Sequence, residues 1–117
     1  ESFGYLTAAR MLDGPNPPTA FLVSSVILAI GVRRAAGERS LRMGRDISVI
    51  CHDDELSYLN NDVGGPAFTA TRSSIRAAGQ RCAEILISLI RNPNHPPIQE
   101  LWDVDLTVGH STGPCPG

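Results

Sequence analysis

The chain lacks lysine and has no long apolar run, and each absence helps to exclude a class of function. Its 117 residues carry ten basic side chains, all arginine, against twelve acidic ones, for a net charge of −2. A chain with this balance has no general attraction for phosphate. The longest apolar run, 20–32, is interrupted by Ser24, Ser25 and Gly31 and is shorter than the roughly 20 residues that a membrane-spanning helix requires. We therefore expect neither a transmembrane segment nor a membrane partner.

Cysteines are few and show no pairing pattern. Cys51, Cys82 and Cys115 are widely spaced, with no Cys-x-x-Cys pair. This spacing predicts reduced thiols in a cytoplasmic protein, rather than a disulfide framework or a zinc site. The chain begins Glu1-Ser2-Phe3, without an initiator methionine or a signal peptide, so we expect a fragment of a longer protein.

Apolar periodicity and turn residues predict alternating helices and strands. In chain order the predicted elements are a helix over 3–12, a strand over 19–23, a helix over 26–36, strands over 46–51 and 68–71, a helix over 75–91, and one or two strands within 98–108. Ser24 or Ser25 is expected to cap the second helix, and Ser73 or Ser74 the third. This order predicts an α/β fold with a largely parallel sheet flanked by helices.

The helix over 75–91 has the clearest amphipathic pattern. Its apolar stripe consists of Ile75, Ala78, Cys82, Ile85, Leu86 and Leu89. Such a stripe is predicted to lie in a core, with Arg72 and Arg76 on the opposite, polar side. The tryptophan at 102, on a predicted strand, is also expected in the core.

Polar side chains follow the first two predicted strands. Ser24-Ser25 comes after the first, and His52-Asp53-Asp54 after the second. Ligands of parallel sheets bind beyond the carboxyl ends of the strands, so Asp53 is the best candidate for a ligand contact. His52, Asp53, Asp54 and Glu55 also have the chemistry of metal ligands. Adjacent residues on an extended segment point to opposite sides, however, so we expect no metal and no cofactor.

Two further patterns have alternative interpretations. Ser25, Asp53 and His110 follow the Ser…Asp…His order of an α/β-hydrolase, but no glycine flanks the serine as a nucleophile elbow requires. Helix capping is the favoured role of Ser25. Five arginines lie within 33–45, namely Arg33, Arg34, Arg39, Arg42 and Arg45. Without interleaved aromatics they indicate a solvated helix end or a partner interface rather than a nucleic-acid patch.

Several short segments, in order and spacing, resemble one bacterial family. They are Pro18-Thr19-Ala20-Phe21, Ala29-Ile30-Gly31, Asp46-Ile47-Ser48-Val49-Ile50, Asp53-Asp54, Pro66-Ala67-Phe68-Thr69, Gly79 and Ser111-Thr112-Gly113-Pro114. Together they resemble the C-terminal part of the effector-binding core of LacI/GalR-type (lactose-repressor family) transcription regulators, over nearly the whole chain. The resemblance implies a periplasmic-binding-protein-like (type I) fold, in which a sugar or other small effector lies between two α/β lobes.

The resemblance also implies a domain arrangement. Residues 1–72 would belong to the C-terminal lobe, 73–102 would cross to the N-terminal lobe, and 103–117 would form the return strand and tail. The DNA-binding headpiece and most of the N-terminal lobe would lie outside this chain, which alone could not bind operator DNA. The helix over 75–91 would then expose part of its stripe. A homodimer is implied, with Ile30, Tyr58 and Leu59 near the partner.

By the same resemblance, Asp53 occupies the family's acidic effector contact, with Ser25 and Ser73 as cleft-lining positions. An ionised carboxylate in a shielded cleft accepts strong hydrogen bonds from hydroxyl groups. The chain departs from the family at Ser25-Val26 (commonly Asn-Asp), Cys51-His52 (Gly-aromatic), Ser73 (Gln) and Gly109 (Arg). The effector therefore need not be a sugar.

The resemblance predicts effector sensing for a transcription regulator, without chemistry on the ligand. The main alternative is a solute-binding protein of a sugar transporter, which has the same fold. The isolated cysteines and the Asp53-Asp54 pair favour the regulator. A small α/β hydrolase using Ser25, Asp53 and His110 is the remaining, less favoured alternative.

Overall fold

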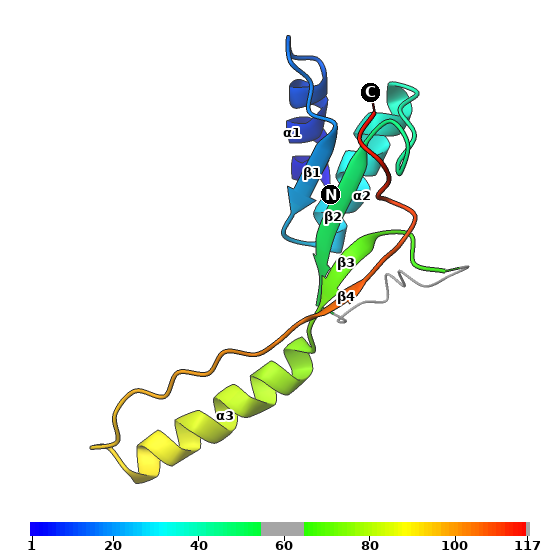
Figure 1. Cartoon of the computed structure of the whole chain (residues 1–117). Helices are drawn as coiled ribbons and strands as arrows, with labels where there is room; N and C mark the ends of the chain where they lie inside the picture. Colours follow the sequence, from blue (N-terminus) through cyan, green and yellow to red (C-terminus); the bar gives the residue numbers. More distant parts are fainter. Residues whose placement is uncertain (55–64, 117) are drawn as a thin grey trace.

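The computed structural model describes residues 1–54 and 65–116 and contains a four-stranded sheet with helices (Figure 1). The elements are α1 (Ser2–Leu12), β1 (Ala20–Val23), α2 (Val26–Glu38), β2 (Ser48–Asp53), β3 (Thr69–Arg72), α3 (Ile75–Arg91) and β4 (Asp105–Thr107). The strand order is β1-β2-β3-β4. The first three strands are parallel and β4 is antiparallel to β3. The predicted α/β fold with a largely parallel sheet is confirmed.

Small residues allow α1 and α2 to pack closely. A Cβ atom at Gly4 would lie 2.5 Å from the Leu28 carbonyl oxygen, and one at Gly31 would lie 2.5 Å from the Tyr5 nitrogen. The buried apolar residues form one cluster that joins this helix pair to the sheet: Ala8, Leu12, Ala29, Val32, Ala35, Ala36, Ile47, Val49, Cys51, Phe68 and Ala70. This cluster is the core of the chain.

The start of β2 differs from the prediction because a local turn replaces the extended conformation there. The carboxylate of Asp46 accepts a hydrogen bond from the Arg42 backbone N–H at 2.9 Å, which closes a turn. Consequently β2 begins at Ser48 rather than at 46, and Asp53 is its last residue. Arg72 ends β3 and does not lie on the polar side of the following helix, so that prediction was wrong.

Segment 109–113 returns to the amino ends of the strands. The Ser111 hydroxyl donates to the Val49 carbonyl oxygen and accepts from the Thr69 N–H at 2.8 Å, and Ser111 is fully buried. The Ser111 carbonyl oxygen also accepts from the Val49 N–H at 2.8 Å. These bonds hold the returning chain against β2 and β3.

An arm made of α3 and the segment between α3 and β4 protrudes from the rest of the chain (Figure 1). The radius of gyration is 18.2 Å, against about 13 Å for a compact chain of this length. No residue of α3 is buried, Leu86 is 60% exposed and Trp102 is 45% exposed. The prediction that the α3 stripe and Trp102 lie in a core is therefore wrong for this chain. None of the helices in the described part is long and apolar enough to cross a membrane.

Candidate functional site

The three predicted ligand positions lie at one edge of the sheet. Val23 and Cys51 are register partners on β1 and β2. Ser25 and Asp53 each lie two residues beyond this pair, and Ser73 directly follows β3. Since the strands are parallel, all three residues are at the carboxyl edge, where α2 and α3 begin (Figure 1).

Asp53 is a buried carboxylate beside a guanidinium. Its exposed fraction is 4%. It is the register partner of Arg72 on β3, and Arg72 Nε lies 3.5 Å from Asp53 Oδ2. The Asp53 carbonyl oxygen accepts the Ser73 N–H at 3.4 Å. A carboxylate accepts strong, charge-assisted hydrogen bonds from the hydroxyl groups of a ligand.

His52 links Ser73 to the sheet. Its Nδ1 lies 2.9 Å from Thr71 Oγ1, and its Nε2 lies 3.0 Å from Ser73 Oγ. In a neutral imidazole one nitrogen donates and the other accepts, so the tautomer decides which hydroxyl donates to the ring. Both ring nitrogens therefore have hydroxyl partners, and the ring orients the Ser73 side chain at the site.

Sequence reasoning placed His52 in a candidate ligand-binding segment and among possible metal ligands, but it did not predict the contacts of His52 with Thr71 and Ser73. It also missed Thr71 and Arg72 as neighbours of the site. The pairing is encoded in the register, because His52 faces Thr71 and Asp53 faces Arg72 across β2 and β3. No sequence pattern specifies the register of two strands separated by 15 residues of intervening chain.

Ser25 is half-buried and caps α2. Its Oγ accepts a hydrogen bond from the Leu28 N–H at 3.4 Å, which confirms the predicted cap. The third helix is capped by Ser74, whose Oγ accepts the Ala77 N–H at 3.2 Å. Ser73 is thereby left for the contact with His52.

The structure separates the residues of the alternative hydrolase triad. The His110 N–H donates to the Pro66 carbonyl oxygen at 3.0 Å, and the His110 ring lies against Gly65. Both contacts are before the start of β3, at the amino edge of the sheet. Ser25 and Asp53 are at the carboxyl edge, so the three side chains cannot act together, and this alternative is wrong.

Two other groups of residues named from the sequence are the alternative metal ligands at 52–55 and the predicted dimer contacts. Across residues 1–54 and 65–116 there is no group of three or more His, Cys, Asp or Glu side chains that could hold a metal; Glu55 lies outside these residues. Ile30, a predicted dimer contact, is half-buried on α2 and packs partly against the core. The other two predicted contacts, Tyr58 and Leu59, also lie outside the described residues.

Comparison with known proteins agrees with this architecture. A family described as "Periplasmic binding protein-like domain" matches residues 2–112. The HTH-type transcriptional regulator AglR of Rhizobium meliloti is 47% identical over 116 residues, which are 99% of this chain and 33% of AglR. The lactose operon repressor of Escherichia coli is 34% identical over 74% of this chain and 23% of the repressor.

Among solved structures, the Lac repressor dimer bound to operator and the anti-inducer ONPF has a TM-score of 0.79 and 30% identity. The match covers 97% of this chain and 33% of that one. This chain thus spans about a third or less of the length of these relatives. Both of these curated relatives are named as regulators of gene expression. The chain belongs to the periplasmic-binding-protein-like domain family, in the form found in the core of LacI-type regulators.

Proposed function

We propose that this chain is part of the effector-sensing core of a DNA-binding transcription regulator, and that Asp53 contacts a small polar effector. The observation that carries the proposal is the buried Asp53 carboxylate at the carboxyl edge, beside Arg72 and next to the start of α3. The carboxylate suits a ligand that donates hydroxyl hydrogens. Ser73, oriented by His52, and Ser25 line the same edge.

The proposed domain arrangement follows from the protruding arm. Residues 1–72 form the C-terminal lobe, 73–102 cross to an N-terminal lobe, and 103–117 return to the first lobe. In support, no residue of α3 is buried, whereas segment 109–113 is hydrogen-bonded to the sheet of the first lobe. The effector cleft is then the gap that α3 crosses, and Asp53 lies at its entrance.

The proposed mechanism is a shift between lobe arrangements. An effector held between two lobes favours the closed arrangement by its higher affinity for that state. In a homodimer this closure changes the geometry of two DNA-binding headpieces and hence the affinity for operator DNA. The Lac repressor structure, a dimer bound to operator and to an anti-inducer, is a relative with these partners. No step of this mechanism alters the effector chemically.

The regulator and the solute-binding alternative differ in the rest of the protein. For the regulator we expect a native product of about 38 kDa, because 12.5 kDa corresponds to a third of the AglR length, with a helix-turn-helix at its N-terminus. Intact mass and N-terminal sequencing of the native product measure this. A signal peptide in place of the helix-turn-helix would identify a transporter component.

The Asp53 contact is tested in the full-length protein. We expect at least one of D-glucose, maltose, sucrose, lactose and ribose to raise the melting temperature. Asp53→Asn should weaken the binding of that sugar by at least about tenfold, because a charge-assisted hydrogen-bond acceptor is lost. Isothermal titration calorimetry measures the affinity, and Asp54→Asn is the matched control. Equal affinities of the two variants would reject Asp53 as the contact.

A further inference from the structure

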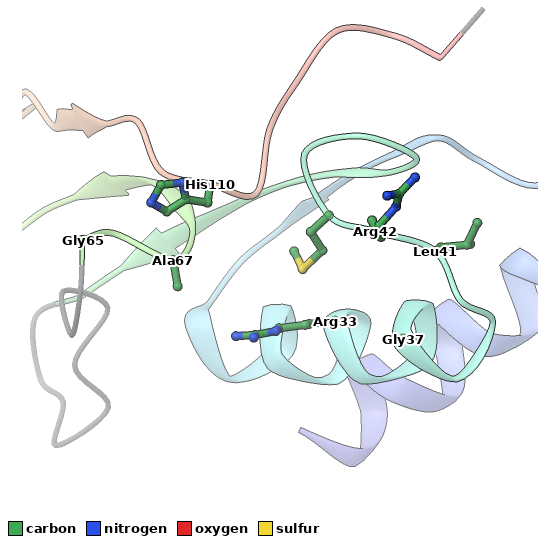
Figure 2. Close-up of a pocket in the computed structure, with 8 residues that line it drawn as sticks. Arg33, Gly37, Leu41, Arg42, Gly65, Ala67 and His110 are labelled. Carbon is green, nitrogen blue, oxygen red and sulfur yellow. The ribbon is translucent and has the colours of Figure 1, made fainter.

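A cavity of about 540 Å³ lies at the opposite edge of the sheet from Asp53. Its walls include Arg33 and Gly37 of α2, Leu41 and Arg42 before β2, and His110 after β4 (Figure 2). The amino edge of the sheet forms this end of the lobe, because α2 runs back from its cap at the carboxyl edge. The cavity is therefore distinct from the proposed effector site, and nothing in the regulator mechanism uses it.

The walls of the cavity are basic in a chain that is acidic overall. They carry two guanidinium groups and one imidazole, and none of the described lining residues is acidic. The net charge of the chain is −2. The two guanidinium groups favour an anion, and the volume is in the range of sites for small ligands.

Arg33 differs from the other arginines of the 33–45 cluster. The ion pairs of the other four are Arg34–Glu1 at 3.1 Å, Arg39–Asp13 at 2.6 Å, Arg42–Asp46 at 3.3 Å and Arg45–Asp46 at 4.0 Å. Within the described part of the chain, Arg33 has no such pair. Arg42 donates its Nε–H to Asp46 Oδ2 at 3.3 Å, and its two terminal amino groups make no hydrogen bond to the described residues.

The residues that line the cavity come from different elements. Figure 2 shows the Arg33 side chain extending from α2 toward the side on which Ala67 and His110 lie, while Arg42 lies at the other wall. A Cβ atom at Gly37 would meet nothing within 4 Å, so the backbone of α2 is open to the cavity at this point. The absence of a side chain at Gly37 thus leaves space for a ligand beside α2.

From this arrangement we infer that the cavity binds a small phosphate-bearing anion, with Arg33 as the principal contact and His110 and Arg42 as further contacts. A guanidinium donates two parallel hydrogen bonds to a phosphate group, and two guanidinium groups on one cavity suit a dianion better than a monoanion such as a carboxylate. The shared chemistry is the phosphate group, whether it comes as inorganic phosphate or as a phosphorylated sugar.

The test is a titration of the ¹⁵N-labelled chain at constant ionic strength. Inorganic phosphate and glucose 6-phosphate are compared with acetate and chloride. We expect phosphate and glucose 6-phosphate to shift the amide resonances of Gly37, Ala67 and His110, with acetate weaker and chloride inactive. Comparable binding of both phosphates indicates free phosphate as a sufficient ligand, and tighter binding of glucose 6-phosphate indicates a phosphorylated sugar.

Variants distinguish a specific binding site from a general effect of the charge of the chain. Arg33→Gln should weaken phosphate binding by at least about tenfold, as expected for loss of charge-assisted hydrogen bonds. Arg34→Gln, the matched control on the next residue, should leave it unchanged. Gly37→Ile places a side chain in the open space and should block binding without a change of charge.

Three results would each overturn the inference. They are the absence of resonance shifts with phosphate, equal affinities of the Arg33→Gln and Arg34→Gln variants, and shifts confined to the residues around Asp53. The measurement does not involve the effector or DNA, so its failure is distinguishable from a failure of the proposed function.

Discussion

Asp53 and Arg72 are register partners at the carboxyl ends of β2 and β3, with Arg72 Nε 3.5 Å from Asp53 Oδ2. The Asp53 side chain is 6% exposed and that of Arg72 is 23% exposed. The pair brings opposite charges together at the carboxyl edge of the sheet, where α3 begins, and it links the stability of the sheet to the proposed ligand site.

We expect Arg72→Met to lower the free energy of unfolding by about 2–4 kcal/mol, because it leaves the buried Asp53 carboxylate without its guanidinium. Urea unfolding followed by circular dichroism measures the change. Arg76→Met, on the exposed first turn of α3, is the control and should change stability by less than about 0.5 kcal/mol. Adding Asp53→Asn to Arg72→Met should recover part of the loss; strictly additive effects would contradict the pairing.

Two glycines of α2 should respond oppositely to alanine. At Gly31 a Cβ atom would collide with the Glu1 carbonyl oxygen and lie 2.5 Å from the Tyr5 nitrogen. We expect Gly31→Ala to force α1 and α2 apart and to lower the free energy of unfolding by about 2–3 kcal/mol. Gly37→Ala meets open space and should raise it by about 0.5–1 kcal/mol through helix propensity. Thermal unfolding of both variants checks the pair, and a stabilised Gly31→Ala would refute the close packing.

Cys51 should make stability fall at alkaline pH. Burial, and secondarily the Asp53 charge, raise the pKa of the Cys51 thiol to about 11. Above pH 9 the unfolded chain loses this proton while the folded chain keeps it, so the folded state binds more protons and the free energy of unfolding decreases. The decrease between pH 9 and 11 should be roughly 2–3 kcal/mol and should be absent from Cys51→Ala.

Urea unfolding at several alkaline pH values, with the Cys51→Ala variant alongside, gives this difference. The same burial predicts the reactivity of the thiols. At neutral pH a thiol reagent should modify the exposed Cys82 and Cys115 and leave Cys51 unmodified until the chain unfolds. Rapid reaction of Cys51 in the folded chain would contradict both expectations.

The arm should make the isolated 117-residue chain self-associate or exchange elements between copies. Leu86 is 60% exposed, and Ile85 and Leu89 are only half-buried, so the apolar face of α3 is accessible. Sedimentation velocity should show a dimer that Leu86→Lys dissociates, whereas Ser88→Lys, at another exposed position of α3, should have little effect. A monodisperse monomer of the unaltered chain would contradict the prediction.

Local chemistry made much of the fold predictable. Helix α3 spans Ile75–Arg91, the predicted range, because a serine cap, a continuous amphipathic repeat and a following Asn92-Pro93 mark both ends. Ser25 caps α2 for the same local reason. The start of β2 was misplaced because a turn closed by Asp46 competed with an apolar run that was equally compatible with extension.

The sequence by itself determined the α/β class, the positions of the helices, and the placement of Asp53 near the carboxyl end of a buried strand, since these depend on periodicity and capping within a few residues. Only the tertiary structure decided that Asp53 faces Arg72, that His52 holds Ser73, and that His110 lies at the amino edge with Arg33. Those contacts join residues brought together by strand register and by the return of segment 109–113, and no local pattern encodes them.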